Sequence, residues 1–337
     1  SDLLKLFYLY FSFLSTKIQE LILTFQQNIE QLTSKKWVMY LIKVSFTLLI
    51  CGVAIWQVKN YFSSKEIIII ITESFARRPY LILLMLSMSF LNWSFEAFKW
   101  ITVLPKKNEI FFFQALKSVL IGLGMSLLIP RLAGETIGRY TSHKGNKQDV
   151  VSALVLTKVF QAIVTLSFGF IGIIYFKSQF VHLLHLPHQS LLFLFVLSSF
   201  IVVFYRKKIT NFIRTNSYFE SFREMNVLKG MQLAVLSVVR YLSFFGQCYT
   251  MCLFINIQLN IIDLFFSLAT VYLVRMATIS INVVVDLGVR FATALFVIST
   301  LGVIPEPNAV IVVFSLVWLF NVILPSLVGG ILILKNQ

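Results

Sequence analysis

The chain has 337 residues, of which 58% are hydrophobic and only 13% are charged, and its mean hydropathy is +0.85. This composition lies far outside that of a soluble globular domain and predicts an integral membrane protein. The formal net charge is +15. The many Phe residues lie within apolar runs rather than on a basic soluble face, so we do not expect nucleic-acid binding. A bilayer-spanning helix takes about 20 residues, which leaves no room here for a fused cytosolic transferase or ATPase module.

The first 36 residues combine an apolar stretch with a longer polar, amphipathic one, and they contain no small-residue cleavage site of the kind that ends a signal peptide. We therefore predict an interfacial amphipathic helix over 1–36 and a transmembrane domain over 37–337.

Within the transmembrane domain, six apolar stretches are long enough to span the bilayer. They are 37–58, 79–98, 150–176, 190–205, 231–255 and 309–334. Two further apolar stretches, 111–129 and 263–301, are broken or followed at once by charge, Gly or Pro. Segments of this kind favour hairpins that enter the membrane and return to the same side.

The distribution of Lys and Arg supports such hairpins. If every apolar stretch crossed the membrane, the basic loops at Lys106 and at Arg206 would lie on opposite sides, against the positive-inside bias. Re-entrant hairpins bring both loops to the cytoplasm, together with the N-terminus. A span, a hairpin and a span then occur twice with opposite orientation, at about 79–176 and 231–334. The fold class that we predict is all-α: a polytopic transmembrane helix bundle with two re-entrant hairpins in an inverted repeat.

The first hairpin carries the densest group of functional residues: Pro130, Arg131, Gly134, Glu135 and Arg139. Pro130 ends the incoming helix. A helix restarting after it places Glu135 four residues from each Arg, on one face. Such a ladder of charges can hold a phosphate through the guanidinium groups. The alternative is a cytoplasmic loop held by ordinary salt bridges.

Other charges fall within apolar segments, where each needs a partner or a cavity. Lys158, Arg240 and Arg275 are candidates to line a substrate cavity, although Lys158 could instead reach the membrane surface. Asp286 and Arg290 could bind substrate or form a structural ion pair. Glu96 and Lys99, three residues apart, form a local pair on this interpretation.

We expect no catalytic group, metal or cofactor. His182, His185 and His188 recur every three residues, but Pro187 breaks the helix that would align them as ligands. No catalytic triad or P-loop is present in the sequence. The three Cys residues lie in apolar runs and are expected to pack as small apolar side chains.

Three groups of residues resemble the lysylphosphatidylglycerol synthase transmembrane-region family, which includes the membrane half of the multiple peptide resistance factors. They are Asn92 with Glu96 to Trp100, then Leu128 to Tyr140, and then Asp286-Leu287-Gly288-Val289-Arg290 with Trp318 to Pro325. The resemblance runs from about residue 79 to the C-terminus and implies a flippase-like bundle with two re-entrant helices. The chain departs from the family at Phe291, where Glu is common, at Thr157-Lys158, where Glu-Arg is common, and at Gln161, where an Asp is common nearby.

The function that we predict is transport of a phospholipid or lipid-linked headgroup across the cell's inner membrane. An anionic headgroup would bind in a cavity between the hairpins, at Arg131, Glu135, Arg139, Lys158, Arg240, Arg275, Asp286 and Arg290. An intramembrane lipid-modifying enzyme and a non-transporting subunit of an envelope complex are the alternatives. A homo-oligomer or an envelope partner is compatible with either role.

Overall fold

The computed structural model describes residues 65–104, 110–127, 131–141, 147–176, 220–257, 259–276, 290, 293–298, 301–303 and 307–335. The chain divides into two compact units, Ser1–Val53 and Ala54–Gln337, and all of these residues belong to the second. The predicted interfacial helix and the predicted spans at 37–58 and 190–205 lie outside the described residues, as do Pro130, Asp286 and Gly288.

All regular secondary structure in the described ranges is helical. The helices are α3 (Lys65–Arg77), α4 (Tyr80–Val103), α5 (Phe112–Met125), α6 (Arg131–Thr141), α7 (Lys147–Tyr175), α10 (Glu220–Arg223), α11 (Val227–Phe254), α12 (Ile261–Met276), α14 (Pro307–Trp318), the π-helical segment η3 (Leu319–Ile323) and α15 (Leu324–Lys335).

Four helices are long and apolar enough to cross a membrane: α4, α7, α11 and the continuous helix formed by α14, η3 and α15. They coincide with four of the predicted spans. Large apolar side chains such as Leu83 and Phe90 on α4 and Ile163 on α7 are exposed, which is favourable in lipid and unfavourable in water. The prediction of an all-α multi-pass membrane protein is confirmed.

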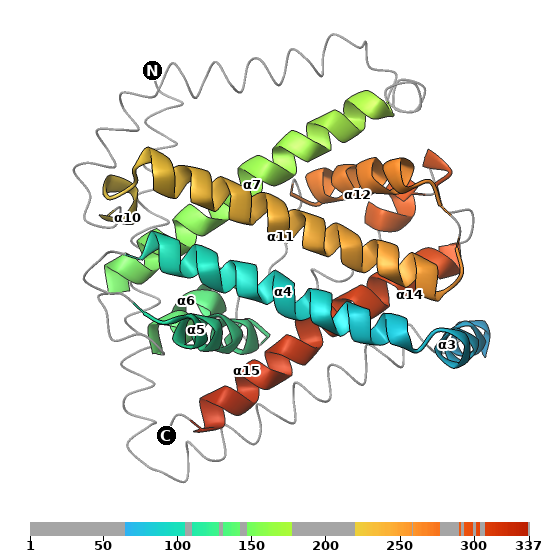
Figure 1. Cartoon of the computed structure of the whole chain (residues 1–337), viewed down its shortest axis with the longest axis horizontal. Helices are drawn as coiled ribbons and strands as arrows, with labels where there is room; N and C mark the ends of the chain where they lie inside the picture. The colour runs from blue at the N-terminus through green and yellow to red at the C-terminus, as the bar shows by residue number, and fades with distance from the viewer. Residues whose placement is uncertain are drawn as a thin grey trace, which may run out of the picture. The chain divides into compact units, whose positions relative to one another are not determined.

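Helices α4 and α11 lie side by side and run antiparallel (Figure 1). At one end of the pair, the Arg78 side chain just before α4 donates to the backbone carbonyl of Leu253, near the end of α11. Farther along α4, Glu96 pairs with Arg240, near the middle of α11. Helix α5 packs on α15, and α12 packs on α7.

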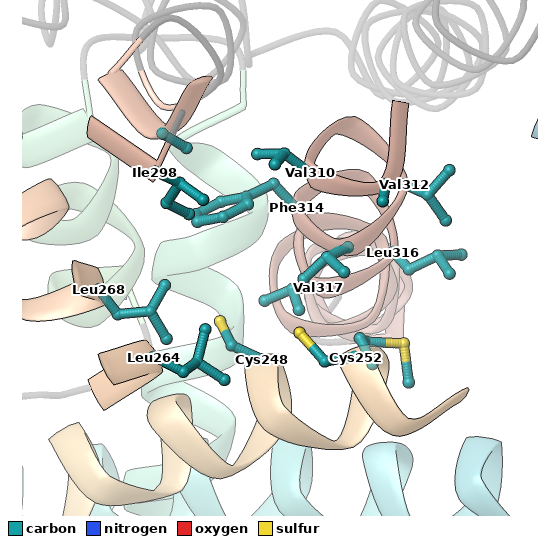
Figure 2. Packing of buried hydrophobic residues seen from close by; sticks show 14 of the residues in the cluster. Cys248, Cys252, Leu264, Leu268, Ile298, Val310, Val312, Phe314, Leu316 and Val317 are labelled. Atoms are coloured by element: carbon teal, nitrogen blue, oxygen red, sulfur yellow. The ribbon is translucent and has the colours of Figure 1, made fainter. Parts of the chain in front are cut away.

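A hydrophobic core joins α11, α12 and α14 (Figure 2). Cys248 and Cys252 on α11 are buried beside Leu264 of α12 and Val317 of α14, and neither forms a disulfide. They pack as small apolar side chains, as the sequence predicts.

Helices α5 and α6 form an antiparallel hairpin. With 14 and 11 residues they measure about 21 and 17 Å, too short to cross a hydrocarbon core of about 30 Å. The backbones touch: a Cβ atom added to Gly138 would collide with Gly122, and one added to Gly134 would lie 2.5 Å from the Cα of Ser126. The re-entry of this hairpin into the membrane stays a prediction, as does the second hairpin, of which residues 277–289 lie outside the described residues.

The π-helical turn η3 has a direct chemical cause in Pro325. The N–H group of Leu324 donates to the carbonyl of Leu319, five residues back, and Pro325 has no N–H to donate. Pro325 therefore cannot donate to the carbonyl of Asn321, four residues back, or to that of Phe320, five residues back. Two side chains of α4 replace the missing donors: Ser89 Oγ donates to the Phe320 carbonyl at 2.7 Å, and Trp93 Nε1 donates to the Asn321 carbonyl at 2.9 Å.

Candidate functional site

The Glu96 carboxylate, 1% exposed on α4, is the centre of a buried ion cluster. Arg139 from α6 and Arg240 from α11 approach its oxygens to 2.9 and 3.1 Å. Lys99, one turn farther along α4, lies at 3.3 Å, and Lys158 from α7 lies at 3.8 Å. Four cations from four helices therefore lie within 4 Å of a single carboxylate.

A second carboxylate, Glu135 on α6, shares two of these cations. Lys158 Nζ lies 2.6 Å from Glu135, and Arg139 lies 3.6 Å from it. Glu135 and Arg139 are one helical turn apart on the same face of α6, as the sequence predicts. Through these pairs the α5–α6 hairpin is held against α4 and α7.

Gln161, one turn after Lys158 on α7, completes the cluster with a neutral acceptor. Its Oε1 atom accepts from Lys99 at 3.1 Å and from Arg240 at 3.4 Å. The sequence shows this residue as a departure from the family pattern. In the structure, an amide oxygen here accepts hydrogen bonds from two cations without adding negative charge.

Two Trp residues on the Glu96 face of α4 cover the guanidinium groups. The Arg139 guanidinium lies 4.7 Å from the ring centroid of Trp100, and that of Arg240 lies 5.3 Å from the ring of Trp93. Both are cation–π distances. Because Trp93 and Trp100 stand three residues before and four after Glu96, helical spacing alone could have identified them.

The ion cluster of Glu96, Lys99, Glu135, Arg139, Lys158 and Arg240 has four cations and two carboxylates, a formal net charge of +2. Charges at membrane depth are costly, and replacing buried ion pairs by apolar residues is often neutral or stabilising. Packing therefore gives no reason for six ionisable side chains at this position. The excess of cations makes the cluster suited to an anion.

Access to the cluster is uneven. The Lys158 side chain is 34% exposed and that of Arg240 is 14% exposed, whereas Glu96, Lys99 and Arg139 are almost completely buried. Lys158 therefore marks the side from which a ligand would first meet the cluster.

The predicted site residues fall into two groups. Glu135, Arg139, Lys158 and Arg240 meet in the ion cluster. Glu96 and Lys99, which the sequence identified as a local pair and as part of the family motif, join them. Arg275, half-buried at the end of α12, and the buried Arg290 both interact electrostatically with Tyr272 of α12. The Arg131 side chain lies outside the described residues. Gly134 and Asn92 have structural roles, in the hairpin contact and in the amide cluster described next.

A second polar cluster, uncharged, lies between α4, α11 and η3. Asn321 Oδ1 accepts from Asn92 Nδ2 at 2.8 Å and from Gln247 Nε2 at 3.4 Å. All three side chains of this amide cluster are buried. Trp93 connects the two clusters, since its ring lies against Arg240 and its N–H group donates to the backbone of Asn321.

A cavity of about 340 Å³ lies elsewhere, at the end of α7 and the start of α12. Tyr175, Asn260, Asp263 and Gly302 are among the residues that line it, and Tyr175 donates to Asp263 at 2.7 Å. The described residues contain no group of three His, Cys, Asp or Glu side chains that could hold a metal, and His182, His185 and His188 lie outside them.

Membrane-crossing helices around a buried, cation-rich cluster define a multi-pass integral membrane protein with a polar site inside its bundle. The chain belongs to the family described as Lysylphosphatidylglycerol synthase TM region, whose sequence model matches residues 40–331. Membership relates the protein to lipid handling. Neither the curated proteins nor the solved structures include a match to this chain.

Proposed function

We propose that this protein is a flippase-like transporter that carries an amphiphile with an anionic headgroup across the membrane. The observation that supports the proposal best is the ion cluster, because it places a formal surplus of two positive charges inside an apolar bundle. In a low-dielectric environment, a phosphate that meets such a surplus forms charge-assisted hydrogen bonds, which are roughly twice as strong as neutral ones.

The geometry suggests how the cluster receives a headgroup. In this structure the two carboxylates form ion pairs with the four cations and limit the repulsion among them. An incoming phosphate would compete with Glu96 and Glu135 for Arg240 and Lys158, the two most accessible cations. Exchange of carboxylate for phosphate would then loosen the contacts between α6, α7 and α11, which gives binding a route to conformational change.

The helix contacts support the predicted repeat. When the two proposed repeats, about 79–176 and 231–334, are exchanged, the packed pair α4–α11 maps onto itself. The packed pair α5–α15 maps onto the pair α7–α12. Gly329 on α15 lies against the backbone of Leu120 and Gly124 in α5, and Gly169 on α7 lies against Ala269 and Leu273 in α12. The spacing within each of these pairs of α5 and α12 residues is the same, as expected for two copies of one motif.

The polar residues follow the same exchange. The Gln161 side chain accepts hydrogen bonds from Lys99 of α4 and Arg240 of α11. The Asn321 side chain likewise accepts from Asn92 of α4 and Gln247 of α11. The spacing of Asn92 and Lys99 on α4 equals that of Arg240 and Gln247 on α11. The corresponding positions are Asn92 with Arg240, Lys99 with Gln247, Leu120 with Ala269, Gly124 with Leu273, Gln161 with Asn321, and Gly169 with Gly329.

The antiparallel arrangement of α4 and α11 supports a two-fold axis in the membrane plane between the two proposed repeats. A two-fold axis that exchanges two antiparallel neighbours runs perpendicular to them. For helices that cross a bilayer, such an axis lies in the membrane plane, which is the geometry of an inverted repeat and of alternating access. We further propose an inner-membrane location, a cytoplasmic N-terminus and transport rather than catalysis. An oligomer or an envelope partner remains compatible with this role.

The test compares lipid binding and lipid movement in matched variants. Lys158→Gln removes the most exposed cation of the cluster, and Lys229→Gln removes one that pairs with Glu224 outside it. Native mass spectrometry with phosphatidylglycerol and phosphatidylcholine should show a preference for the anionic lipid. We expect Lys158→Gln to reduce that preference by about tenfold, since one charge-assisted contact is lost, and Lys229→Gln to leave it unchanged. Arg131→Ala belongs in the same series because the sequence places Arg131 in the site.

Movement is measured in liposomes with a tail-labelled phosphatidylglycerol and a membrane-impermeant quencher. The wild type should expose inner-leaflet lipid to the quencher, and Lys158→Gln should do so more slowly. Anionic selectivity that survives Lys158→Gln would overturn the binding mechanism. Selective binding without movement would overturn transport in favour of a non-transporting subunit, and release of a cleaved headgroup would overturn it in favour of an enzyme.

A further inference from the structure

The amide cluster of Asn92, Gln247 and Asn321 has a composition that packing does not explain. Its side chains are 2%, 0% and 6% exposed. Buried carboxamides in a membrane bundle are retained at a cost unless all their hydrogen bonds are made. Gln247 makes one contact through Nε2, while its buried Oε1 atom accepts no hydrogen bond within the described part of the chain.

The position of the cluster points to a ligand. Asn92, Gln247 and Asn321 correspond to Arg240, Lys99 and Gln161 under the exchange of halves, so the amide cluster occupies the place that the ion cluster holds in the other half. Trp93 links the two, because its ring lies against Arg240 and its N–H donates to the backbone carbonyl of Asn321. This link places the amide cluster beside the ion cluster.

The chemistry of the cluster is that of an uncharged hydrogen-bonding site. It offers carboxamides and, beside them, the carbonyl groups of Phe320 and Asn321, to which Pro325 cannot donate. Side chains of α4 donate to both carbonyls, so separation of α4 from η3 would remove both donors together. A hydroxyl group suits such a site because it donates to carbonyl oxygens and also accepts from carboxamide N–H groups.

We propose that the amide cluster is a headgroup subsite that binds hydroxyl groups while the ion cluster binds the phosphate of the same lipid. The proposal rests on the anionic-headgroup transport proposed above. Gln247 is then a specificity-determining residue. The ion cluster selects for negative charge, and the amide cluster selects for hydroxyl groups.

The experiment uses two lipids of equal charge. Phosphatidylglycerol and phosphatidylmethanol are both singly anionic phosphodiesters, and only the first has headgroup hydroxyls. Native mass spectrometry of the wild type should show that phosphatidylglycerol binds about threefold to tenfold more tightly, the value of one neutral hydrogen bond. Gln247→Leu should abolish this difference, but the protein should still bind both anionic lipids in preference to phosphatidylcholine. Lys158→Gln should reduce the preference for the two anionic lipids over phosphatidylcholine and keep the difference between phosphatidylglycerol and phosphatidylmethanol.

Gln232→Leu, at an exposed position of the same helix, is the matched control and should change neither preference. Gln247→Met, which better preserves the shape of the side chain, serves as a second variant, with melting temperatures measured for all. Equal binding of the two lipids by the wild type, or discrimination that persists in folded Gln247→Leu or Gln247→Met, would overturn the hydroxyl subsite. If the wild type does not prefer anionic lipids to phosphatidylcholine, the proposed function itself is overturned.

Discussion

Glu96 illustrates how one side chain can determine whether a buried site is stable. Its carboxylate compensates four cations at once, and its own exposed fraction is 1%. Removal of one partner from a buried ionic group leaves charge uncompensated and typically costs about 3 to 5 kcal/mol. We therefore expect Glu96→Gln to lower the free energy of unfolding by about that amount.

Chemical unfolding in detergent micelles measures this change. Glu73→Gln is the matched control, because Glu73 pairs with Arg77 at 3.2 Å on the exposed face of α3, where an ion pair contributes less than about 1 kcal/mol. If the two variants lose similar stability, Glu96 does not compensate the cluster.

Substitutions of Trp93 and Trp100 measure the contribution of a single hydrogen bond, from Trp93 Nε1 to the Asn321 carbonyl. Trp93→Phe keeps an aromatic ring beside Arg240 but removes the donor to the Asn321 carbonyl, and we expect a loss of about 1 to 3 kcal/mol because that carbonyl is left buried. Trp100→Phe is the control, since Trp100 Nε1 makes no hydrogen bond within the described residues. Both variants lose similar volume, so the difference between their melting temperatures isolates the hydrogen bond.

The interruption of the last membrane helix can be tested at the scale of the element. Pro325→Ala restores an N–H group four residues after Asn321, which can then donate to the carbonyl that Trp93 now satisfies. In that background Trp93→Phe should cost less, so the two substitutions should be non-additive by about 1 kcal/mol in a double-mutant cycle. Strict additivity would show that the π-helical turn has another cause.

Close helix packing provides a second prediction for elements. In Gly329→Ala the new methyl group would collide with the Leu120 carbonyl of α5, and backbone atoms cannot move away cheaply. Overpacking of this kind typically costs about 1 to 3 kcal/mol or more. Gly230→Ala in α11 is the control: its methyl group would meet only the Phe160 ring at 4.0 Å, and Ala is the better helix former. Thermal unfolding should show a large loss for the first and a small gain for the second.

Topology is a property of the whole molecule. The predicted arrangement places single Cys residues near Lys107, Asn146 and Lys208 inside the cell and one near His185 outside. A membrane-impermeant maleimide applied to intact cells should label only the last, in a background from which Cys51, Cys248 and Cys252 have been removed. External labelling near Asn146 would require the α5–α6 hairpin to cross the membrane, and the re-entrant arrangement would be wrong.

Composition and apolar run length were sufficient to predict the membrane class, the all-α fold and four spans that the structure describes, because a bilayer requires about 20 apolar residues and internally satisfied backbone whatever the neighbours are. The sequence also singled out Glu135, Arg139, Lys158 and Arg240, which the structure brings together in the ion cluster. Ionisable groups in apolar segments are conspicuous in any single sequence. The family resemblance rested on the first-hairpin residues but not on Lys158, which departs from the family pattern, or on Arg240.

Only the tertiary structure decided which charges meet. Helical spacing relates Glu96 to Lys99 and Glu135 to Arg139, but no local rule brings α4, α6, α7 and α11 to one point or makes Glu96 rather than Glu135 the common partner of four cations. The roles of Gln161, Trp93 and Gln247 likewise depend on contacts between helices that are far apart in sequence. Such contacts follow from the packing of whole helix faces, which depends on every residue of each face, whereas periodicity and composition describe one segment at a time.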